Sequence, residues 1–176
     1  SLGAGTINQS IIVHLKALIE SNIQVIWQTG KNYFADCKTA LEKCQWLNTN
    51  SPIICTDFVS QMPLAYALAD LVISRAGASS ISELCLLGKP AILVPSPNVA
   101  EDHQTHHAMA LVNKNAAVLV KDKDAQNNLI PIALQLIKDN QKLLDLHTNI
   151  LGRALPDSAR IIAAEVIKLA TKNRNN

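Results

Sequence analysis

The sequence predicts a doubly wound α/β domain in which helices cover a mostly parallel sheet. Short apolar runs rich in Val and Ile alternate with segments that have the apolar spacing of a helix, and a polar or glycine-containing turn lies between them. Each apolar run is continuous over four or five residues, which is typical of strands buried on both faces of a parallel sheet.

The elements follow in order from this pattern. A first helix over residues 7–20 places its apolar side chains, Ile7, Ile11, Leu15, Leu18 and Ile19, on one side. The expected strands cover 23–28, 52–56, 70–74, 90–95 and 116–120. Further helices are expected near 33–45, 61–68, 80–87, 103–114, 125–138 and 157–170. Residues 1–170 are therefore expected to form one domain, followed by a polar tail over 171–176.

The composition fits one folded domain with no strong electrostatic character. Of the 176 residues 48% are hydrophobic, and the formal charge of +2 comes from 16 basic and 14 acidic residues. Aromatic residues make up only 3% and the charges form no long run, so a nucleic-acid partner is not indicated. No apolar run approaches about 18 residues and no signal-peptide pattern opens the chain, so we expect a cytoplasmic protein.

A run of very small residues stands between an expected strand and an expected helix in the segment 74–95, SRAGASSISELCLLGKPAILVP. Ligands of doubly wound sheets bind at such strand ends. The free N–H groups of a helix start favour a phosphate, and Gly77 and Ala78 add no bulk that would exclude one. The alternative is a tight turn followed by a capping box of Ser80 and Glu83. Gly88 is expected to end this helix after about two turns.

A second small-residue turn, SLGAGTINQ, opens the chain directly before the first expected helix. It is similar to a phosphate-binding turn whose preceding strand is absent, so we expect the chain to be part of a longer one. A dinucleotide-binding fingerprint is a weaker interpretation, because Asn8 stands where a third Gly or Ala is expected and no strand precedes the turn.

The third turn, residues 96–110, collects histidines and an amide. His103, His106 and His107 have the spacing i, i+3, i+4, which permits a metal site on one helix face. No acid or cysteine is obviously paired with them, and a helix start that hydrogen-bonds a sugar also explains Gln104, so no metal is expected. The cysteines include no CxxC pair and are expected to be buried free thiols. They are Cys37, Cys44, Cys55 and Cys85.

Six segments, taken in order, carry a resemblance to a known family. They are SLGAGTINQ, VIWQTGK, TDFVSQMPLAYALADLVISRAGASSISEL, GKPAILVPSP, EDHQTHHAMAL and LPDSARIIAAEV. Together they resemble the C-terminal half of the MurG family, GT-B glycosyltransferases of family 28 that act in peptidoglycan synthesis. The resemblance implies a Rossmann-like GT-B half. It also implies an inverting enzyme that moves GlcNAc from UDP-GlcNAc to the muramyl-pentapeptide lipid called lipid I, forming lipid II.

The resemblance also implies a role for individual residues in binding UDP-GlcNAc. Phe58 and Val59 would hold uracil mainly through main-chain atoms, although two core residues would fit these positions equally. Glu83 would accept hydrogen bonds from the ribose hydroxyls. Ser1 would belong to a glycine-rich loop, GGS-x-G in the family, whose two glycines would precede the chain. The other implied contacts are Ala78, Ser79 and Ser80 at the diphosphate, and His103, Gln104 and His107 at the sugar.

Two positions leave the comparison with the family open. His107 stands where family members commonly have Asn, and an imidazole is larger and carries its donor elsewhere. Arg75, at the end of an expected strand, fits either a surface ion pair or a phosphate contact.

The resemblance covers only one half of the enzyme. In the family the other half supplies the general base, the acceptor site and the membrane-associating surface, so no catalytic residue is expected here, and the chain should bind the donor without turning it over. No divalent cation or other cofactor is implied. Two alternatives remain: a natural donor-binding subunit that needs a separate acceptor subunit, and another UDP-sugar enzyme such as a UDP-GlcNAc 2-epimerase.

Overall fold

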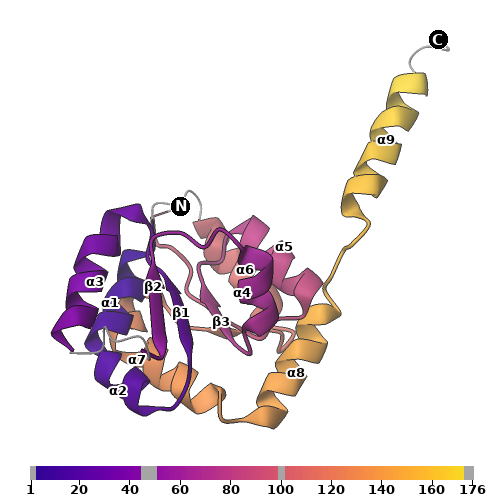
Figure 1. Ribbon diagram of the computed structural model, residues 1–176. Helices are drawn as coiled ribbons and strands as arrows, with labels where there is room; N and C mark the ends of the chain where they lie inside the picture. Colours follow the sequence, from indigo (N-terminus) through magenta and orange to yellow (C-terminus); the bar gives the residue numbers. More distant parts are fainter. Residues whose placement is uncertain (1–2, 45–50, 99–101, 173–176) are drawn as a thin grey trace.

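Parallel strands alternate with helices along the chain, as predicted. The computed structural model describes residues 3–44, 51–98 and 102–172 (Figure 1). Strand β1 (Val25–Gln28) pairs with β2 (Ile53–Thr56), and β4 (Ala91–Leu93) pairs with both β3 (Val72–Ser74) and β5 (Val118–Leu119). Every one of these pairs is parallel, but the strands form two sheets instead of the single sheet expected.

Every predicted helix is present, and most of their bounds lie within three residues of the prediction. The helix expected over 7–20 is divided at His14, whose ring Nδ1 lies 2.9 Å from the Ser10 carbonyl oxygen. One helix, α8, was not predicted. The last helix ends at Lys172, inside the predicted tail. The helices are α1 (Gly5–Val13), α2 (Leu15–Glu20), the 3₁₀ helix η1 (Lys31–Tyr33), α3 (Phe34–Lys43), α4 (Met62–Leu68), α5 (Ala78–Leu87), α6 (His103–Val112), α7 (Asp122–Leu136), α8 (Asn140–Leu151) and α9 (Ser158–Lys172).

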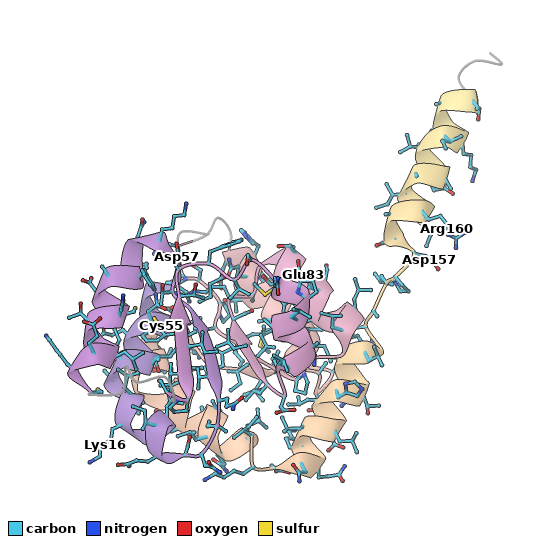
Figure 2. All side chains as sticks on the ribbon, in the orientation of Figure 1. Lys16, Cys55, Asp57, Glu83, Asp157 and Arg160 are labelled. Atoms are coloured by element: carbon cyan, nitrogen blue, oxygen red, sulfur yellow. The ribbon has the colours of Figure 1, made fainter. Side chains whose placement is uncertain are left out.

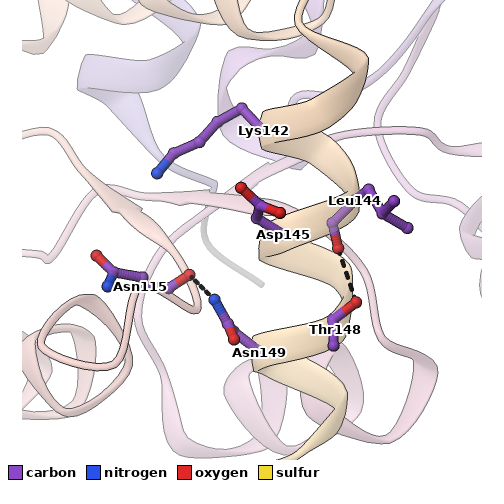
Figure 3. Close-up of a pocket in the computed structure, with 6 residues that line it drawn as sticks. All are labelled: Asn115, Lys142, Leu144, Asp145, Thr148 and Asn149. Carbon is purple, nitrogen blue, oxygen red and sulfur yellow. Dashed lines mark hydrogen bonds between the residues drawn. The ribbon is translucent and has the colours of Figure 1, made fainter.

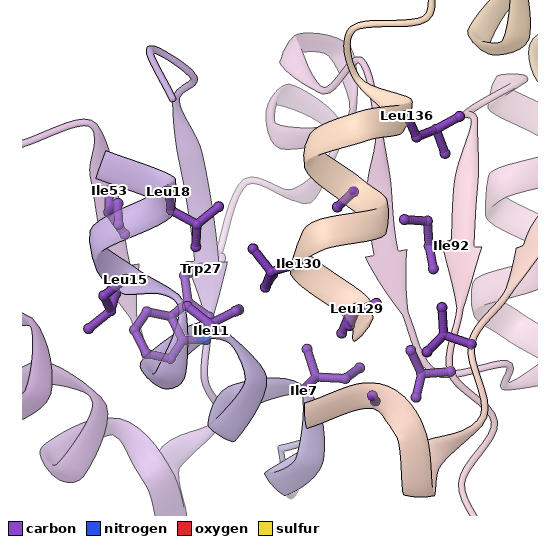
Figure 4. Close-up of a cluster of buried hydrophobic side chains, with 14 of the residues drawn as sticks. Ile7, Ile11, Leu15, Leu18, Trp27, Ile53, Ile92, Leu129, Ile130 and Leu136 are labelled. Atoms are coloured by element: carbon purple, nitrogen blue, oxygen red, sulfur yellow. The ribbon is translucent and has the colours of Figure 1, made fainter. Parts of the chain in front are cut away.

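The larger hydrophobic core lies where α1, α2 and α7 meet the strands. Ile7 and Ile11 are buried together with Leu129 and Ile130 of α7 and with Trp27 of β1 (Figure 4). Leu15 and Leu18 of α2 join the same core, which confirms the apolar side predicted for the first helix. This packing holds α1 and α7 side by side, so the positions of their first turns depend on the same core.

The strands of the first sheet are not buried on both faces, contrary to the prediction. All three residues of β4 are buried, as expected for a central strand. In contrast, Ile26 of β1 is 42% exposed and its register partner Ile54 of β2 is 62% exposed. A continuous apolar run therefore predicts a strand correctly. It does not predict whether helices bury both faces of that strand.

Helix α9 extends away from the body of the molecule (Figure 1). Its apolar side chains are exposed: Ile161, Ile162, Val166, Ile167 and Leu169. Within the described residues, no helix is both long enough and apolar enough to cross a bilayer.

All four cysteines are free thiols. Cys37 and Cys85 are buried, whereas Cys44 and Cys55 are half-buried. Burial raises the pKa of the Cys37 thiol to about 11, so this group stays protonated and unreactive near neutral pH.

Candidate functional site

The carboxyl ends of the strands bring the predicted binding turns to one edge of the molecule. Thr29, after β1, donates its N–H to the Thr56 carbonyl oxygen at 2.9 Å, and Val94, after β4, donates to the Ser74 carbonyl oxygen at 2.9 Å. Figure 2 labels Asp57, which follows β2, and Glu83 of α5, and both lie near the upper edge of the body. This is the edge at which ligands bind in doubly wound sheets.

Helix α5 begins at this edge without a side-chain cap. Its N-cap residue is Gly77, and no side-chain cap hydrogen bond forms there among the residues that the structure describes. Because the first N–H groups of a helix have no partner within the helix, they remain able to bind an anion. Ala78 and Ser79 are exposed and Ser80 is half-buried in this turn. The capping-box alternative is wrong, since Ser80 is the third residue of the helix and not its N-cap.

Gly77 is not needed for the packing of the chain itself. Its φ of −67° and ψ of 147° are open to any residue. Of the described residues, a Cβ placed there would meet only Ser80 Oγ, at 3.9 Å. Gly88, which ends α5 as predicted, is different, because it has a φ of +62° and a Cβ there would lie 2.7 Å from His147 Cε1. The missing side chain at Gly77 therefore leaves open space at the helix start.

Glu83 is tied to the neighbouring helix α4. The Tyr66 hydroxyl donates a hydrogen bond to Glu83 Oε2 at 3.0 Å. Burial, and to a lesser degree this bond, raises the pKa of Tyr66 to about 12, so the phenol remains a donor at neutral pH. The Glu83 carboxylate is exposed and keeps further lone pairs, so it can accept hydrogen bonds from a ligand as well.

Hydrogen bonds shape the loop after β2, which contains Phe58 and Val59. Gln28 Oε1 accepts from the Val59 N–H at 2.8 Å, and Thr56 Oγ1 donates to the Phe58 carbonyl oxygen at 3.1 Å. Phe58 is 59% exposed, so it is not a core residue, and Val59 is half-buried. The loop thus presents an apolar ring at the site edge on a backbone fixed from β1 and β2.

The loop between β4 and α6 positions Gln104. Its Oε1 accepts from the Ser96 N–H at 3.0 Å, which leaves its NH₂ group to donate to a ligand. Asp102 precedes α6 with a φ of 50° and accepts from Thr105 Oγ1 at 2.6 Å. Gln104 is half-buried, and the bond from Ser96 anchors one end of its amide.

Two of the three histidines predicted at this helix start lie close together, and the third, His106, is exposed. The rings of His103 and His107 have centroids 5.7 Å apart and are tilted by 55°. His107 Nδ1 is buried and has no hydrogen-bond partner among the described residues. No group of three or more His, Cys, Asp or Glu side chains in the described part of the chain could hold a metal ion.

Arg75 forms an ion pair. Its guanidinium lies against the carboxylate of Asp122, the first residue of α7. The same group donates to the carbonyl oxygens of Val94 at 3.1 Å and Pro95 at 3.2 Å. Of the two roles that the sequence left open, the structure shows an ion pair, but a largely enclosed one and not the surface pair expected.

The opening turn packs against the loop after β1. Asn8 is buried, donates to the Thr29 carbonyl oxygen at 2.9 Å and accepts from Trp27 Nε1 at 2.9 Å. A Cβ at Gly3 would lie 2.4 Å from that Thr29 oxygen. Asn8 is therefore a core hydrogen-bonding residue that ties the opening turn to the end of β1. Ser1 lies outside the described residues.

A pocket of about 410 Å³ lies elsewhere, between α8 and the turn before β5 (Figure 3). Asn149 donates to the Asn115 carbonyl oxygen at 3.1 Å on its wall. Asn115 precedes β5, so this pocket is at the amino end of that strand. None of the predicted site residues lines it.

Comparison with known proteins identifies the family. Residues 1–160 match the model of the glycosyltransferase family 28 C-terminal domain. The chain belongs to this family. Its fold matches the crystal structure of Acinetobacter baumannii MurG, with a TM-score of 0.77 and 25% sequence identity over 96% of this chain and 47% of that one. The Rossmann-like half predicted for a GT-B member is confirmed.

Curated relatives are more similar still. Several are named UDP-N-acetylglucosamine–N-acetylmuramyl-(pentapeptide) pyrophosphoryl-undecaprenol N-acetylglucosamine transferase. The one from Bacteroides thetaiotaomicron is 56% identical over 97% of this chain and 45% of its own length. The one from Parabacteroides distasonis is 53% identical over 98% of this chain and 46% of its own length. The chain therefore spans about half the length of the curated relatives it matches.

Several polar residues at the site were not found from the sequence. Gln28, Tyr66 and Asp122 each hold a predicted site residue or its loop, from a position at least 17 residues away in the chain. Gln28 ends a predicted strand, so its place at the ligand edge was a usable signal. Nothing local marked Tyr66 or Asp122.

Proposed function

We propose that the chain is the donor-binding half of a hexosyltransferase that moves GlcNAc from UDP-GlcNAc to lipid I and forms lipid II. Membership of family 28 and the names of the relatives support this proposal. Those names favour the transferase over a UDP-GlcNAc 2-epimerase. The observation that carries the proposal is the uncapped start of α5, with open space at Gly77.

The donor would lie across the edge formed by the strand ends. Its uracil would contact the backbone of Phe58 and Val59, and its ribose hydroxyls would donate to Glu83. The diphosphate would bind the first turn of α5 at Ala78, Ser79 and Ser80, with Ser1 nearby. The sugar would contact His103, Gln104 and His107. The NH₂ group of Gln104 and the unpartnered Nδ1 of His107 are the groups that support this end of the site.

The chemistry assigned to this half is stabilisation of the leaving group. In an inverting displacement a base removes the proton of the acceptor hydroxyl, which attacks the anomeric carbon as the bond to UDP breaks. Negative charge then develops on the diphosphate, and the N–H groups at the start of α5 would stabilise it. We assign the base, lipid I binding and peripheral association with the cytoplasmic face of the membrane to the half of the relatives that this chain does not match.

Titration calorimetry with UDP-GlcNAc, UDP and UDP-glucose tests the proposal. We expect binding of UDP-GlcNAc and UDP, and weaker binding of UDP-glucose, because the contacts at Gln104 would read the acetamido sugar. Far-UV circular dichroism controls for folding. Heats equal to those of buffer in a folded sample would remove the proposed function.

A further inference from the structure

One hydrogen-bonded network connects four elements next to the turn that leads into α5. Arg75 follows β3 and donates to the carbonyl oxygens of Val94 and Pro95 at the end of β4. It also forms the ion pair with Asp122 at the start of α7. Asp122 Oδ2 accepts in turn from Thr6 Oγ1 of α1 at 3.0 Å. We call Thr6, Arg75 and Asp122 the Arg75 network.

The Arg75 network is enclosed, so its hydrogen bonds can hold the elements that it joins in fixed relative positions. The side chains of Arg75 and Asp122 are only 23% and 19% exposed, so solvent screens their attraction less than that of a surface pair. Both carboxylate oxygens of Asp122 are engaged, one by each partner. Asp122 also stands in the first turn of α7, where a negative charge is favourable.

The positions of the network residues connect the two small-residue turns. Thr6 is the second residue of α1 and directly follows the turn at Gly3–Gly5. Arg75 directly precedes Ala76 and Gly77, which lead into α5. Each turn leads directly into the start of its helix, and Asp122 contacts a residue next to each turn, so a shift of either partner changes the spacing between the two turns.

We propose that Arg75 and Asp122 are positioning residues for the donor diphosphate. Their ion pair holds the turn before α1 and the turn before α5 at the spacing that lets both contact one diphosphate. Arg75 does not itself bind a phosphate, because Asp122 neutralises its charge and two carbonyl oxygens orient it. This inference rests on the proposed function and adds to it the residues that hold the two turns of the diphosphate site in place.

The variant Asp122→Asn separates positioning from direct phosphate binding by the sign of its effect. If Arg75 positions the turns, loss of the Asp122 charge weakens UDP binding. If Arg75 binds phosphate, the same change frees a cation and tightens UDP binding. Asp124→Asn is the matched control, because Asp124 is an exposed acid in the same first turn of α7.

Calorimetry of UDP and NMR titration of uridine on the 176-residue chain provide the test. We expect Asp122→Asn and Arg75→Gln each to raise the Kd for UDP about tenfold, since small misplacements of binding groups are costly. The double variant should bind no more weakly than either single variant, uridine affinity should stay unchanged, and Asp124→Asn should match wild type. Melting temperatures show that each variant is folded under the conditions of the titration.

Three results would overturn the inference. They are UDP binding by Asp122→Asn at or above wild-type affinity, additive losses in the double variant, and equal losses for UDP and uridine. A folded wild-type protein that binds no UDP is a different outcome, because it removes the proposed function and this inference with it.

Discussion

Gly77→Val should abolish most UDP binding while leaving the fold intact. The backbone at Gly77 is extended and its Cβ position is open, so the chain accommodates the valine. Valine is a weaker N-cap than glycine, but it also restricts the unfolded chain more than glycine does. These effects offset each other, so the free energy of unfolding should change by less than about 1 kcal/mol. The diphosphate would meet the new methyl groups at a cost of about 2 kcal/mol, which raises the Kd about 30-fold. Gly77→Ala should give a smaller loss.

Gly88→Ala is the matched control for this prediction. Gly88 ends the same helix, but its left-handed backbone and the nearby His147 ring make a side chain unfavourable there. We expect a loss of about 1–2 kcal/mol in the free energy of unfolding with unchanged affinity for UDP. Urea denaturation and calorimetry on both variants measure the two effects. A Gly77→Val protein that binds UDP like wild type would show that the diphosphate lies elsewhere.

Glu83→Gln should weaken binding of UDP-GlcNAc about five- to thirtyfold. The amide still accepts the Tyr66 hydroxyl, so the link to α4 remains, but it offers the ribose hydroxyls a neutral acceptor in place of a charged one. Loss of that charge assistance costs about 1–2 kcal/mol. Because the helix is not capped by this residue, thermal stability should not fall.

Tyr66→Phe measures how much the Tyr66 hydroxyl contributes to binding by holding the Glu83 carboxylate in place. It removes the hydroxyl that contacts Glu83 and leaves the carboxylate in place. Its loss of affinity should be smaller than that of Glu83→Gln. If Glu83→Gln and Glu83→Ala both bind UDP-GlcNAc as wild type does, Glu83 has no contact with the ribose and its assignment is wrong.

Local patterns were sufficient to predict the order of strands and helices and the end of α5. Gly88 was expected to end α5, and its φ of +62° confirms the left-handed position that favours glycine. Helix α8 was missed although signals were present. Asp139 caps it by accepting from the Lys142 N–H, and Leu146 and Ile150 have helical spacing and are buried. The helix is therefore encoded locally, by a cap and an apolar face.

The contacts that shape the candidate site could not be predicted in the same way. Asp122 and Arg75 are 47 residues apart, and their pairing depends on where α7 packs against the ends of β3 and β4. The capping box was a sound local pattern, but α5 begins two residues before Ser80, so a different residue takes the N-cap. The exposure of Ile54 depends on which helices cover the first sheet, and a strand sequence does not encode that.

Amide chemical shifts of the ¹⁵N-labelled chain titrated with UDP-GlcNAc test the location of the donor site most directly. We predict that the shifts cluster at residues 57–59, 77–83 and 103–107, at the carboxyl ends of the strands. The pocket between α8 and Asn115 is the natural comparison, since it lies at the amino end of β5. Shifts confined to residues 142–149 and Asn115, with none at the start of α5, would contradict the account.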